Sequence, residues 1–438
     1  MRPANRAAIY RSLAAAALLC SPLRPAHAAG PDEILQGALA RLRSETSTFS
    51  RYACIETVER QYFEPARMET GRQCSQVPAA DSGEKLESID RLRLEVTVSE
   101  GNEIYSWPGA TRFDSRDVTE IIRQGPIATG SFGTHLLAVF NNRQVEYRFA
   151  GEETRAGRRL LEFRFHVPLA ASQYRVRVGT AYQAIAYDGS FWVDAESLEM
   201  QRFTVEAEDV PRATSICRLD AELDYQAQTN GGRGFLLPSQ GQLHIDFESA
   251  RRTNNITTFS NCRQYQAESE VVFQGSPQID QSTAVRPPWA SVALPIGLPV
   301  TLALEAPVDT DSAAAGDPVA ARVVAAVRRP GTDTVLIPAG AMVHGRLTRV
   351  ERHLEPKPYF LIAMSFNRLD WQGISSPFGA HAEANETLAR ELEANPSEPS
   401  GGFRFWDTGT FLFPTSKSRY VMPAGFATKW MTLAPRLR

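Results

Sequence analysis

The clearest pattern in the chain is an alternation of apolar and polar residues that recurs in short segments between residues 52 and 274. Segments such as RLRLEVTVSEG, RRLLEFRFHV and LEMQRFTVEAE change character at almost every position, which is the period of a strand with one buried face. Successive segments are separated by short polar or Gly-containing stretches. The pattern therefore predicts one large antiparallel sheet.

Two stretches have the spacing of helices instead. Near residue 31 the chain reads PDEILQGALARLRSETSTF, with Pro31 and acidic residues at its start and apolar residues three and four apart. The apolar set is Ile34, Leu35, Ala38, Leu39 and Leu42. Between residues 116 and 140 the segments DVTEIIRQG and GTHLLAVF are also helical in pattern. We expect these helices to cover one face of the sheet.

The strand pattern stops at GSPQIDQSTAVRPPWASVALPIGLP, residues 275–299, where prolines cluster. About 410 residues beyond the N-terminal segment also favour more than one domain. The predicted organisation is a signal peptide at 1–28, a first domain at 29–274, a linker at 275–290 and a second domain at 291–438 with a polar insertion at 380–402. The fold class is mostly β with a few helices.

A Pro-Ala-Gly sequence occurs twice in the second domain, in LIPAGAMVHGR and in VMPAGFATKW. With Pro at the second position and Gly at the fourth, each predicts a type I turn between two strands of a small closed sheet. The apolar residues expected to face the interior of that sheet are Val335, Ile337, Met342, Val421, Met422 and Phe426.

The N-terminus predicts export. Its first eleven residues carry Arg2, Arg6 and Arg11 without an acid, and the apolar run SLAAAALLC and the sequence Ala26-His27-Ala28 follow. This is typical of a secretory signal peptide cut after Ala28. No later segment reaches about 18 consecutive apolar residues, so we expect no transmembrane anchor in the mature chain and a periplasmic or extracellular location.

Charge and cysteine content fit that location. Cleavage removes four arginines, which leaves 43 Lys and Arg against 50 acids, a formal charge of about −7 that does not suit a nucleic-acid partner. Cys54, Cys74, Cys217 and Cys262 remain, an even number for an oxidising compartment. Of the three ways to pair them, we favour Cys54 with Cys74 and Cys217 with Cys262, because each pair brackets adjacent strands. The spacing does not suit a metal site.

A helix followed by a long meander resembles the periplasmic half-barrel of LolA-type lipoprotein carriers. The residues that carry the resemblance lie in YDGSFWVDAESLEMQRF: Tyr187, Asp188, Gly189, Phe191, Trp192, Val193 and Asp194. The resemblance implies a half-barrel with covering helices in the first domain and a lipid or lipoprotein as its ligand.

The second domain resembles the C-terminal β-barrel of TrbI-type conjugation proteins of type IV secretion systems. Its GLPVTLALEAPVDTDSAAAGDPVAARVVAAV, VLIPAGAMVHGRLTRVER and YFLIAMSFNRLDWQG segments follow in that family's order. The matching positions are Asp311, Ser312, Gly316, Leu336, Ile337, Pro338, Gly340, Gly345, Asn367, Arg368 and Leu369. The resemblance implies a small β-barrel or sandwich that contacts envelope proteins. Its insertion HAEANETLARELEANPSEPSGG is acidic and polar, which disfavours a pore in a lipid membrane.

The sequence contains no catalytic or nucleotide-binding signature such as HExxH, GxSxG or a Walker loop. The pairs considered for acid/base or metal chemistry are Glu56 with Glu59, Asp220 with Glu222, and His344 with His353. Solvent-facing strand positions explain them more simply. We therefore predict no cofactor, no metal and no enzymatic activity. A periplasmic hydrolase with a site between the domains is the alternative, and a purely structural protein is a third.

Aromatic residues of the first domain are the better candidates for a ligand site, because a half-barrel lined with rings suits an acyl chain or a peptide. They are Tyr105, Trp107, Phe113, Tyr187, Phe191 and Trp192. The alternative is that these rings only fill the core. The functional prediction is an exported envelope binding or scaffold protein.

Overall fold

The computed structural model describes residues 30–47, 52–65, 74, 84–110, 112–114, 116–122, 125–178, 181–207, 209–230, 233–264, 294–355, 357–382 and 409–434. The predicted signal peptide and linker, and the predicted insertion after residue 382, lie outside these residues. The domain boundaries stay predictions. The described residues form two separate hydrophobic cores, one in residues 30–264 and one in residues 294–434, here called the N-terminal and C-terminal units.

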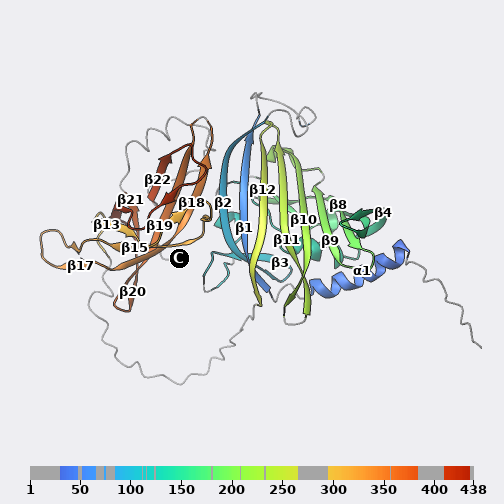
Figure 1. Cartoon of the computed structure of the whole chain (residues 1–438), viewed down its shortest axis with the longest axis horizontal. Helices are drawn as coiled ribbons and strands as arrows, with labels where there is room; N and C mark the ends of the chain where they lie inside the picture. The colour runs from blue at the N-terminus through green and yellow to red at the C-terminus, as the bar shows by residue number, and fades with distance from the viewer. Residues whose placement is uncertain are drawn as a thin grey trace, which may run out of the picture.

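A curved antiparallel sheet forms the body of the N-terminal unit (Figure 1). Its strands are β1 Tyr52–Glu64, β2 Lys85–Ser99, β3 Asn102–Ser106, β4 Glu146–Arg155, β5 Arg158–Val167, β8 Tyr187–Asp194, β9 Met200–Ala207, β10 Ile216–Asn230, β11 Arg233–Phe247 and β12 Arg252–Gln264. They pair in the order β3-β2-β1-β12-β11-β10-β9-β8-β5-β4. A separate ribbon pairs β6 Arg175–Val178 with β7 Ala181–Ala184.

Three helices accompany this sheet in the described residues: α1 Pro31–Thr46, α2 Val118–Ile121 and α3 Thr134–Phe140, with short 3-10 turns at Leu169–Ala171 and Arg212–Thr214. The buried apolar side chains of α1 and α3 join the core on one face of the sheet, here called the inner face. The helical spacing read from the sequence is confirmed at all three helices. The amphipathic side chains of α1 bury a row of aliphatic groups, which stabilises a helix that would be marginal alone.

The C-terminal unit is a second antiparallel sheet around its own core. Its strands are β13 Pro299–Leu304, β15 Pro318–Val323, β18 Met342–His353, β19 Tyr359–Trp371, β20 Ile374–Pro377, β21 Ala380–Ala382, β22 Gly409–Pro414 and β24 Ala427–Thr432. The order is β22-β19-β18-β15-β13-β24-β21, with β20 also on β19. Two ribbons pair β14 Val308–Asp309 with β23 Val421–Met422, and β16 Val327–Arg328 with β17 Val335–Ile337. The mostly β fold with two antiparallel sheets is confirmed.

The prediction that this small sheet is closed is wrong for the described strands, since no backbone pairing joins β21 to β22 or β20. Its alternation is only partly as expected. Ile337 and Met422 are buried, whereas Val335 and Val421 are exposed. All four residues belong to the two-strand ribbons, so the expected pattern of one buried face does not hold there.

The two units are joined along one edge of β2. One edge of β2 pairs with β1 over its whole length. Its other edge pairs with β18 at residues 88–90, with Ala315 around Leu92, and with β3 from residue 95 onward. Figure 1 shows the C-terminal unit beside β2, with β18 next to it. The two sheets therefore form one continuous hydrogen-bonded sheet.

The repeated Pro-Ala-Gly turns differ from the predicted type I geometry. In both turns the amide after Gly donates to the Pro carbonyl, Ala341 to Pro338 and Phe426 to Pro423. Pro is thus the first residue and Gly the third, with φ of +80° at Gly340 and +77° at Gly425. That geometry suits a type II turn, whose third position needs a positive φ.

Both turns have the same structural role. The Gly340 amide donates to Val323 at the end of β15, and the Gly425 amide donates to Leu304 at the end of β13. Each turn then leads directly into the next strand, β18 or β24. The Pro-Ala-Gly sequence is therefore repeated because both copies form the same turn, which begins a new strand next to the end of an earlier one.

The substitution Gly425→Ala should destabilise the C-terminal unit by about 1–2 kcal/mol, because an L residue at this positive φ is strained even though no heavy atom would touch the added methyl group. Gly151→Ala is the matched control, since Gly151 also has open space around it but no positive φ. Urea unfolding of both variants measures the difference. Equal stability of the two variants would contradict the assigned turn.

Candidate functional site

Three of the six aromatic residues predicted to bind a ligand lie on the inner face. Tyr105, Tyr187 and Phe191 are at most 2% exposed and belong to the core of the N-terminal unit. Phe191 packs edge-on against Phe140 of α3, with ring centroids 5.1 Å apart. These residues are therefore part of the packed core, and their role in binding a ligand stays a prediction.

The other three lie elsewhere. Trp192 is on the outer face, where the Arg202 guanidinium lies 4.9 Å from its ring. Trp107 faces the C-terminal unit, with Arg346 5.3 Å from its ring. Phe113 is half-buried in the segment before α2. The alternation of β8 explains the separation of Phe191 from Trp192, since consecutive residues of a strand point to opposite faces.

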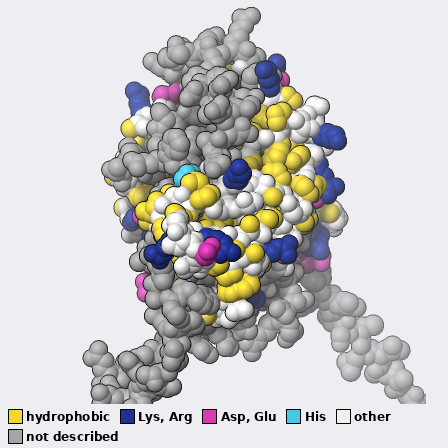
Figure 2. Space-filling view, turned by 90° about the vertical axis from the view of Figure 1, so that its left-hand side faces the viewer, with side chains coloured by type: hydrophobic (Ala, Val, Ile, Leu, Met, Phe, Trp, Pro, Cys, Tyr) yellow, Lys and Arg dark blue, Asp and Glu magenta, His cyan; other side chains and the backbone are white. Residues whose placement is uncertain are grey.

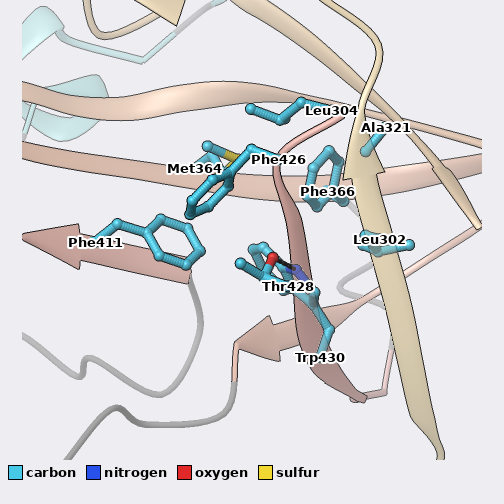
Figure 3. Close-up of a pocket in the computed structure, with 9 residues that line it drawn as sticks. All are labelled: Leu302, Leu304, Ala321, Met364, Phe366, Phe411, Phe426, Thr428 and Trp430. Carbon is cyan, nitrogen blue, oxygen red and sulfur yellow. Dashed lines mark hydrogen bonds between the residues drawn. The ribbon is translucent and has the colours of Figure 1, made fainter. Parts of the chain in front are cut away.

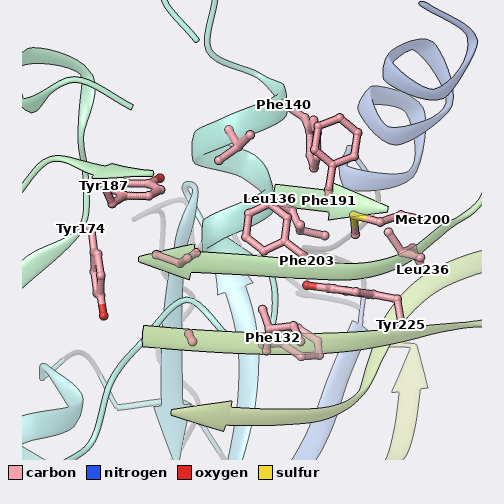
Figure 4. Close-up of a cluster of buried hydrophobic side chains, with 14 of the residues drawn as sticks. Phe132, Leu136, Phe140, Tyr174, Tyr187, Phe191, Met200, Phe203, Tyr225 and Leu236 are labelled. Carbon is pink, nitrogen blue, oxygen red and sulfur yellow. The ribbon is translucent and has the colours of Figure 1, made fainter. Parts of the chain in front are cut away.

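The inner face is filled with aromatic side chains. Phe165 stacks on Phe203 with centroids 5.2 Å apart, and Phe163 stacks on Phe191 at 5.4 Å. Figure 4 shows α3 above these rings, with Leu136 and Phe140 directed into them. The segment 132–140 therefore occupies the apolar space of the inner face with its own side chains.

A single carboxylate, that of Glu103 on β3, fixes the start of this covering segment. It accepts hydrogen bonds from the amides of Gly130, Phe132, Gly133 and Thr134 at 2.6, 2.9, 2.9 and 3.3 Å. The Tyr105 hydroxyl donates to the same carboxylate at 2.7 Å. Charge-assisted bonds of this kind are stronger than neutral ones, so Glu103 is the main polar attachment of the segment.

The far end of the segment is attached by two weaker bonds. The Arg43 guanidinium of α1 donates to the Phe140 carbonyl at 3.0 Å. The Tyr147 hydroxyl donates to the Val139 carbonyl at 2.8 Å. The segment is therefore attached to the sheet and to α1 at both of its ends.

Beside Glu103 lies a second acid, Glu56 of β1. Glu56 is 3% exposed, and its Oε2 atom has no hydrogen-bond partner among the described residues. Burial, reinforced by the negative charge of Glu103, raises the pKa of Glu56 well above its usual range. Burial therefore favours the protonated, neutral form of this carboxyl.

Two further polar groups face the same region. Tyr225 of β10 is 2% exposed and its hydroxyl has no partner among the described residues. Burial lowers the pKa of His135 on α3 to about 4, although the charge of Glu103 opposes this shift, so its imidazole is neutral at pH 7. The name "polar centre" is used below for Glu56, Glu103, Tyr105, His135 and Tyr225.

The sequence pattern singled out Glu56 only as part of a carboxylate pair with Glu59 and did not predict this centre. A signal was present, because Glu56 has the same parity on β1 as Cys54 and Val58, which are both buried. An acid at an inward position of a strand is unusual. Its neighbours Glu103 and Tyr225 lie on other strands, so their convergence depends on the pairing of those strands.

The contact between the two units is a second candidate region. Arg93 donates to both Asp317 carboxylate oxygens at 2.5 and 2.6 Å, and to the Ser312 carbonyl at 2.9 Å. The Arg93 amide donates to Ala315, whose amide donates to Arg91, both at 2.8 Å. The turn that carries the resemblance to TrbI-type proteins is thus bound to the N-terminal unit.

Ionised side chains are buried next to this contact. Arg60 pairs with Asp90 through two bonds of 2.6 and 2.7 Å, and Asp90 lies opposite Glu351 of β18. Burial alone would raise the pKa of Glu351, but Arg349 and His353 hold it at about 2. Each carboxylate thus has its own cation, which is the condition under which buried charges are tolerated.

The disulfides differ from the favoured pairing. Cys54 is bonded to Cys262 and Cys74 to Cys217, with Cα atoms 4.0 and 5.1 Å apart. The favoured pairing assumed that sequence neighbours are spatial neighbours. Instead β1 pairs with β12, so the first and last strands of the N-terminal sheet lie side by side.

An apolar cavity lies in the core of the C-terminal unit (Figure 3). Its volume is about 10 Å³, roughly the least space that one water molecule needs. Leu302, Met364, Phe411 and Trp430 are among its lining residues, and the Trp430 indole donates to the Thr428 hydroxyl at 2.8 Å. A cavity of this volume is too small for a ligand.

The end of the C-terminal unit away from β2 exposes apolar side chains. Ile296 and Val324 are 68% and 52% exposed, and Val335 is also exposed. Figure 2 shows hydrophobic side chains interspersed with Lys and Arg on this face. Within the described residues, no helix has the length and apolarity needed to cross a membrane.

The groups considered for hydrolysis are not brought together. Glu56 is on the inner face, whereas Glu59 pairs with Arg91 on the other face. Asp220 and Glu222 pair with Arg218 and Arg202.

The two histidines of β18 are equally far from forming a site. His344 pairs with Asp370, and His353 pairs with Glu351. The two histidines are nine residues apart on one strand, which separates their Cα atoms by roughly 30 Å at the usual rise per residue. No group of three or more metal-ligating side chains occurs among the described residues.

Comparison with known proteins finds likeness of fold only. No family model matches the chain. No curated protein matches it either.

Among solved structures, a LolA-superfamily protein from Nitrosomonas europaea has 8% identity and a TM-score of 0.27, covering 53% of this chain and 93% of that one. An outer-membrane lipoprotein-sorting domain from Vibrio parahaemolyticus has 11% identity and a TM-score of 0.27, covering 54% and 95%. ComB10 of the Com type IV secretion system of Helicobacter pylori has 12% identity and a TM-score of 0.19, covering 32% and 87%. The neighbours include both groups that the sequence motifs resemble.

The substitution Glu56→Gln should raise the stability of the protein at pH 7 relative to wild type, because burial favours the protonated carboxyl in the folded state whereas the unfolded chain ionises Glu56. The folded-state pKa is raised, so the cost is absent below the ordinary value of 4.5 and grows as the pH rises above it. Denaturant unfolding between pH 4 and pH 8 measures this. Glu153→Gln, at an exposed position, is the control and should show no such trend.

The substitution Asp317→Asn should loosen the contact between the units, because it replaces a charged partner of Arg93 with a neutral one. We expect faster hydrogen exchange at the amides of Arg93 and Ala315, with exchange in β10 and β11 unchanged. Asp333→Asn, an exposed control in the same unit, should leave all these amides as they are. Unchanged exchange at Arg93 in the Asp317 variant would show that the backbone pairing alone holds the units.

Proposed function

We propose that this chain is an exported envelope protein without enzymatic activity, which binds an apolar ligand on the inner face of its N-terminal unit. The observation that carries the proposal is the aromatic inner face, over which a short segment is attached mainly by polar bonds at its ends. Two disulfides fit the oxidising compartment that the signal peptide predicts.

The covering segment supports this proposal because the hydrogen bonds that attach it lie at its two ends, away from the apolar core that it covers. The bonds from Arg43, Tyr147 and Glu103 lie at the two ends of residues 130–140. If those bonds break and the segment moves away, the Leu136 and Phe140 side chains no longer cover the inner face. An apolar surface of the size and shape of these side chains is then exposed. A ligand with an apolar body would bury the same surface and recover its hydrophobic stabilisation.

The second part of the proposal concerns the C-terminal unit, which we propose presents a surface to a protein partner in the envelope. Backbone pairing along β2 and the Arg93–Asp317 pair fix its orientation to the ligand-binding unit. The exposed apolar and basic side chains at its far end are free for such a contact. In this arrangement the chain connects a ligand to a partner as a single rigid body.

The test begins with protein purified from the periplasm, whose organic extract is analysed by mass spectrometry beside native spectra of the intact protein. We expect an apolar molecule in near-stoichiometric amount. The extracted protein should then bind the apolar fluorophore 1-N-phenylnaphthylamine. Arg43→Ala should bind this probe about fivefold more tightly, because one hydrogen bond of the covering segment is worth about 1 kcal/mol.

Arg155→Ala, at an exposed position of β4, is the control for the loss of one positive charge and should bind the probe like wild type. A bare intact mass, together with no probe binding by wild type or Arg43→Ala, would overturn the proposal. The purely structural interpretation of the chain would then be the better one.

A further inference from the structure

We propose that the ligand of the inner face carries a positively charged head group, such as a primary ammonium, which the polar centre receives between Glu56 and Glu103. This inference rests on the proposed function, because it specifies the head group of the ligand proposed there. The ligand class is a cationic amphiphile with an apolar chain.

The first reason is that the polar centre contains polar atoms without partners inside an apolar core. The Glu56 Oε2 atom and the Tyr225 hydroxyl oxygen have no hydrogen-bond partner among the described residues, and both side chains are at least 97% buried. Buried polar atoms in native proteins are nearly always paired, and an orphan costs about 1–3 kcal/mol. Two orphans in one place indicate a missing polar group.

The second reason is that the register of β1, β12, β11 and β10 brings both orphans to the same level of the sheet. Figure 4 shows the Tyr225 ring lying across the inner face, with its hydroxyl pointing away from Leu236. Glu103 is close enough for its charge to affect the pKa values of Tyr225 on β10, Glu56 on β1 and His135 on α3. The cross-strand neighbours of Glu56 are Leu94 and Phe259, which are apolar.

The third reason is the sign of the charge. The side chains of the polar centre supply two carboxyl groups, and its one histidine is kept neutral by burial. An ammonium group would donate to Glu56 and to the Tyr225 oxygen, and the proton that Glu56 carries would leave to solvent. An anionic head group would instead face Glu103 without a cation, at a large cost in a desolvated site.

The inner face also explains where the rest of such a ligand would lie. The aromatic rings of Phe191, Phe203 and Phe132 extend from the polar centre along the inner face. An alkyl chain entering there replaces the Leu136 and Phe140 side chains and leaves its head beside Glu103. Glu103 is half-buried, so the head group can reach it from solvent.

The experiment compares three probes of equal chain length, namely dodecylamine, dodecanol and dodecanoate, in displacing 1-N-phenylnaphthylamine from the full mature protein at pH 7. We expect dodecylamine to bind at least tenfold more tightly than dodecanoate, with dodecanol between them. Glu56→Gln should reduce the ratio of amine to acid severalfold, and Tyr225→Phe should weaken the amine without affecting the acid.

Glu153→Gln is the matched control, because it makes the same side-chain substitution at an exposed position and removes a full surface charge. If Glu153→Gln lowers the ratio as much as Glu56→Gln does, the preference comes from net charge and the inference is overturned. If all three probes bind equally and Glu56→Gln has no effect, the inference fails while the proposed function stands. If none of them displaces the fluorophore, the inference fails, whereas binding of the fluorophore itself still supports the proposed function.

Discussion

The structure depends on the hydrogen bonding of both edges of one strand, β2. One edge is taken entirely by β1, and the other is divided among β18, Ala315 and β3. An unpaired sheet edge exposes donors and acceptors that invite association with other chains. Here the C-terminal unit occupies that edge, so the same bonds protect the sheet and fix the orientation of the two units.

Charged side chains follow the same edge and make the contact specific. Arg91 and Arg93 bind carbonyls and a carboxylate of the C-terminal unit, and the Arg60–Asp90 pair lies beside Glu351 and Arg349. Buried ion pairs add little net stability, but removing one partner is costly. The arrangement therefore favours one register of β18 against β2 over its alternatives.

On the inner face, packing and polarity are in conflict. The aromatic side chains fill the face with closely packed rings, whereas Glu56 and Tyr225 retain polar atoms without partners. A core selected only for stability would have apolar residues at these positions. This energetic cost is the observation on which the proposed head-group site rests.

The sequence alone determined the local structure: the helix at 31–46, the strands of both units, the short helices at 118–140, and the two resemblances. It could do so because side-chain alternation and helical spacing are local properties of the chain. It also gave Tyr105, Tyr187 and Phe191 as candidate ligand contacts; the structure buries all three in one core, and their role in binding stays a prediction.

Only the tertiary structure decided which strands are neighbours, and with that the disulfide pairing, the seam along β2 and the meeting of Glu56 with Glu103 and Tyr225. Backbone hydrogen bonds are the same for every pair of strands, so the local pattern does not specify their partners. The Pro-Ala-Gly turns illustrate the same limit. In each turn the Gly residue has a positive φ and its amide donates to the end of another strand, β15 or β13, and the local sequence does not specify that partner.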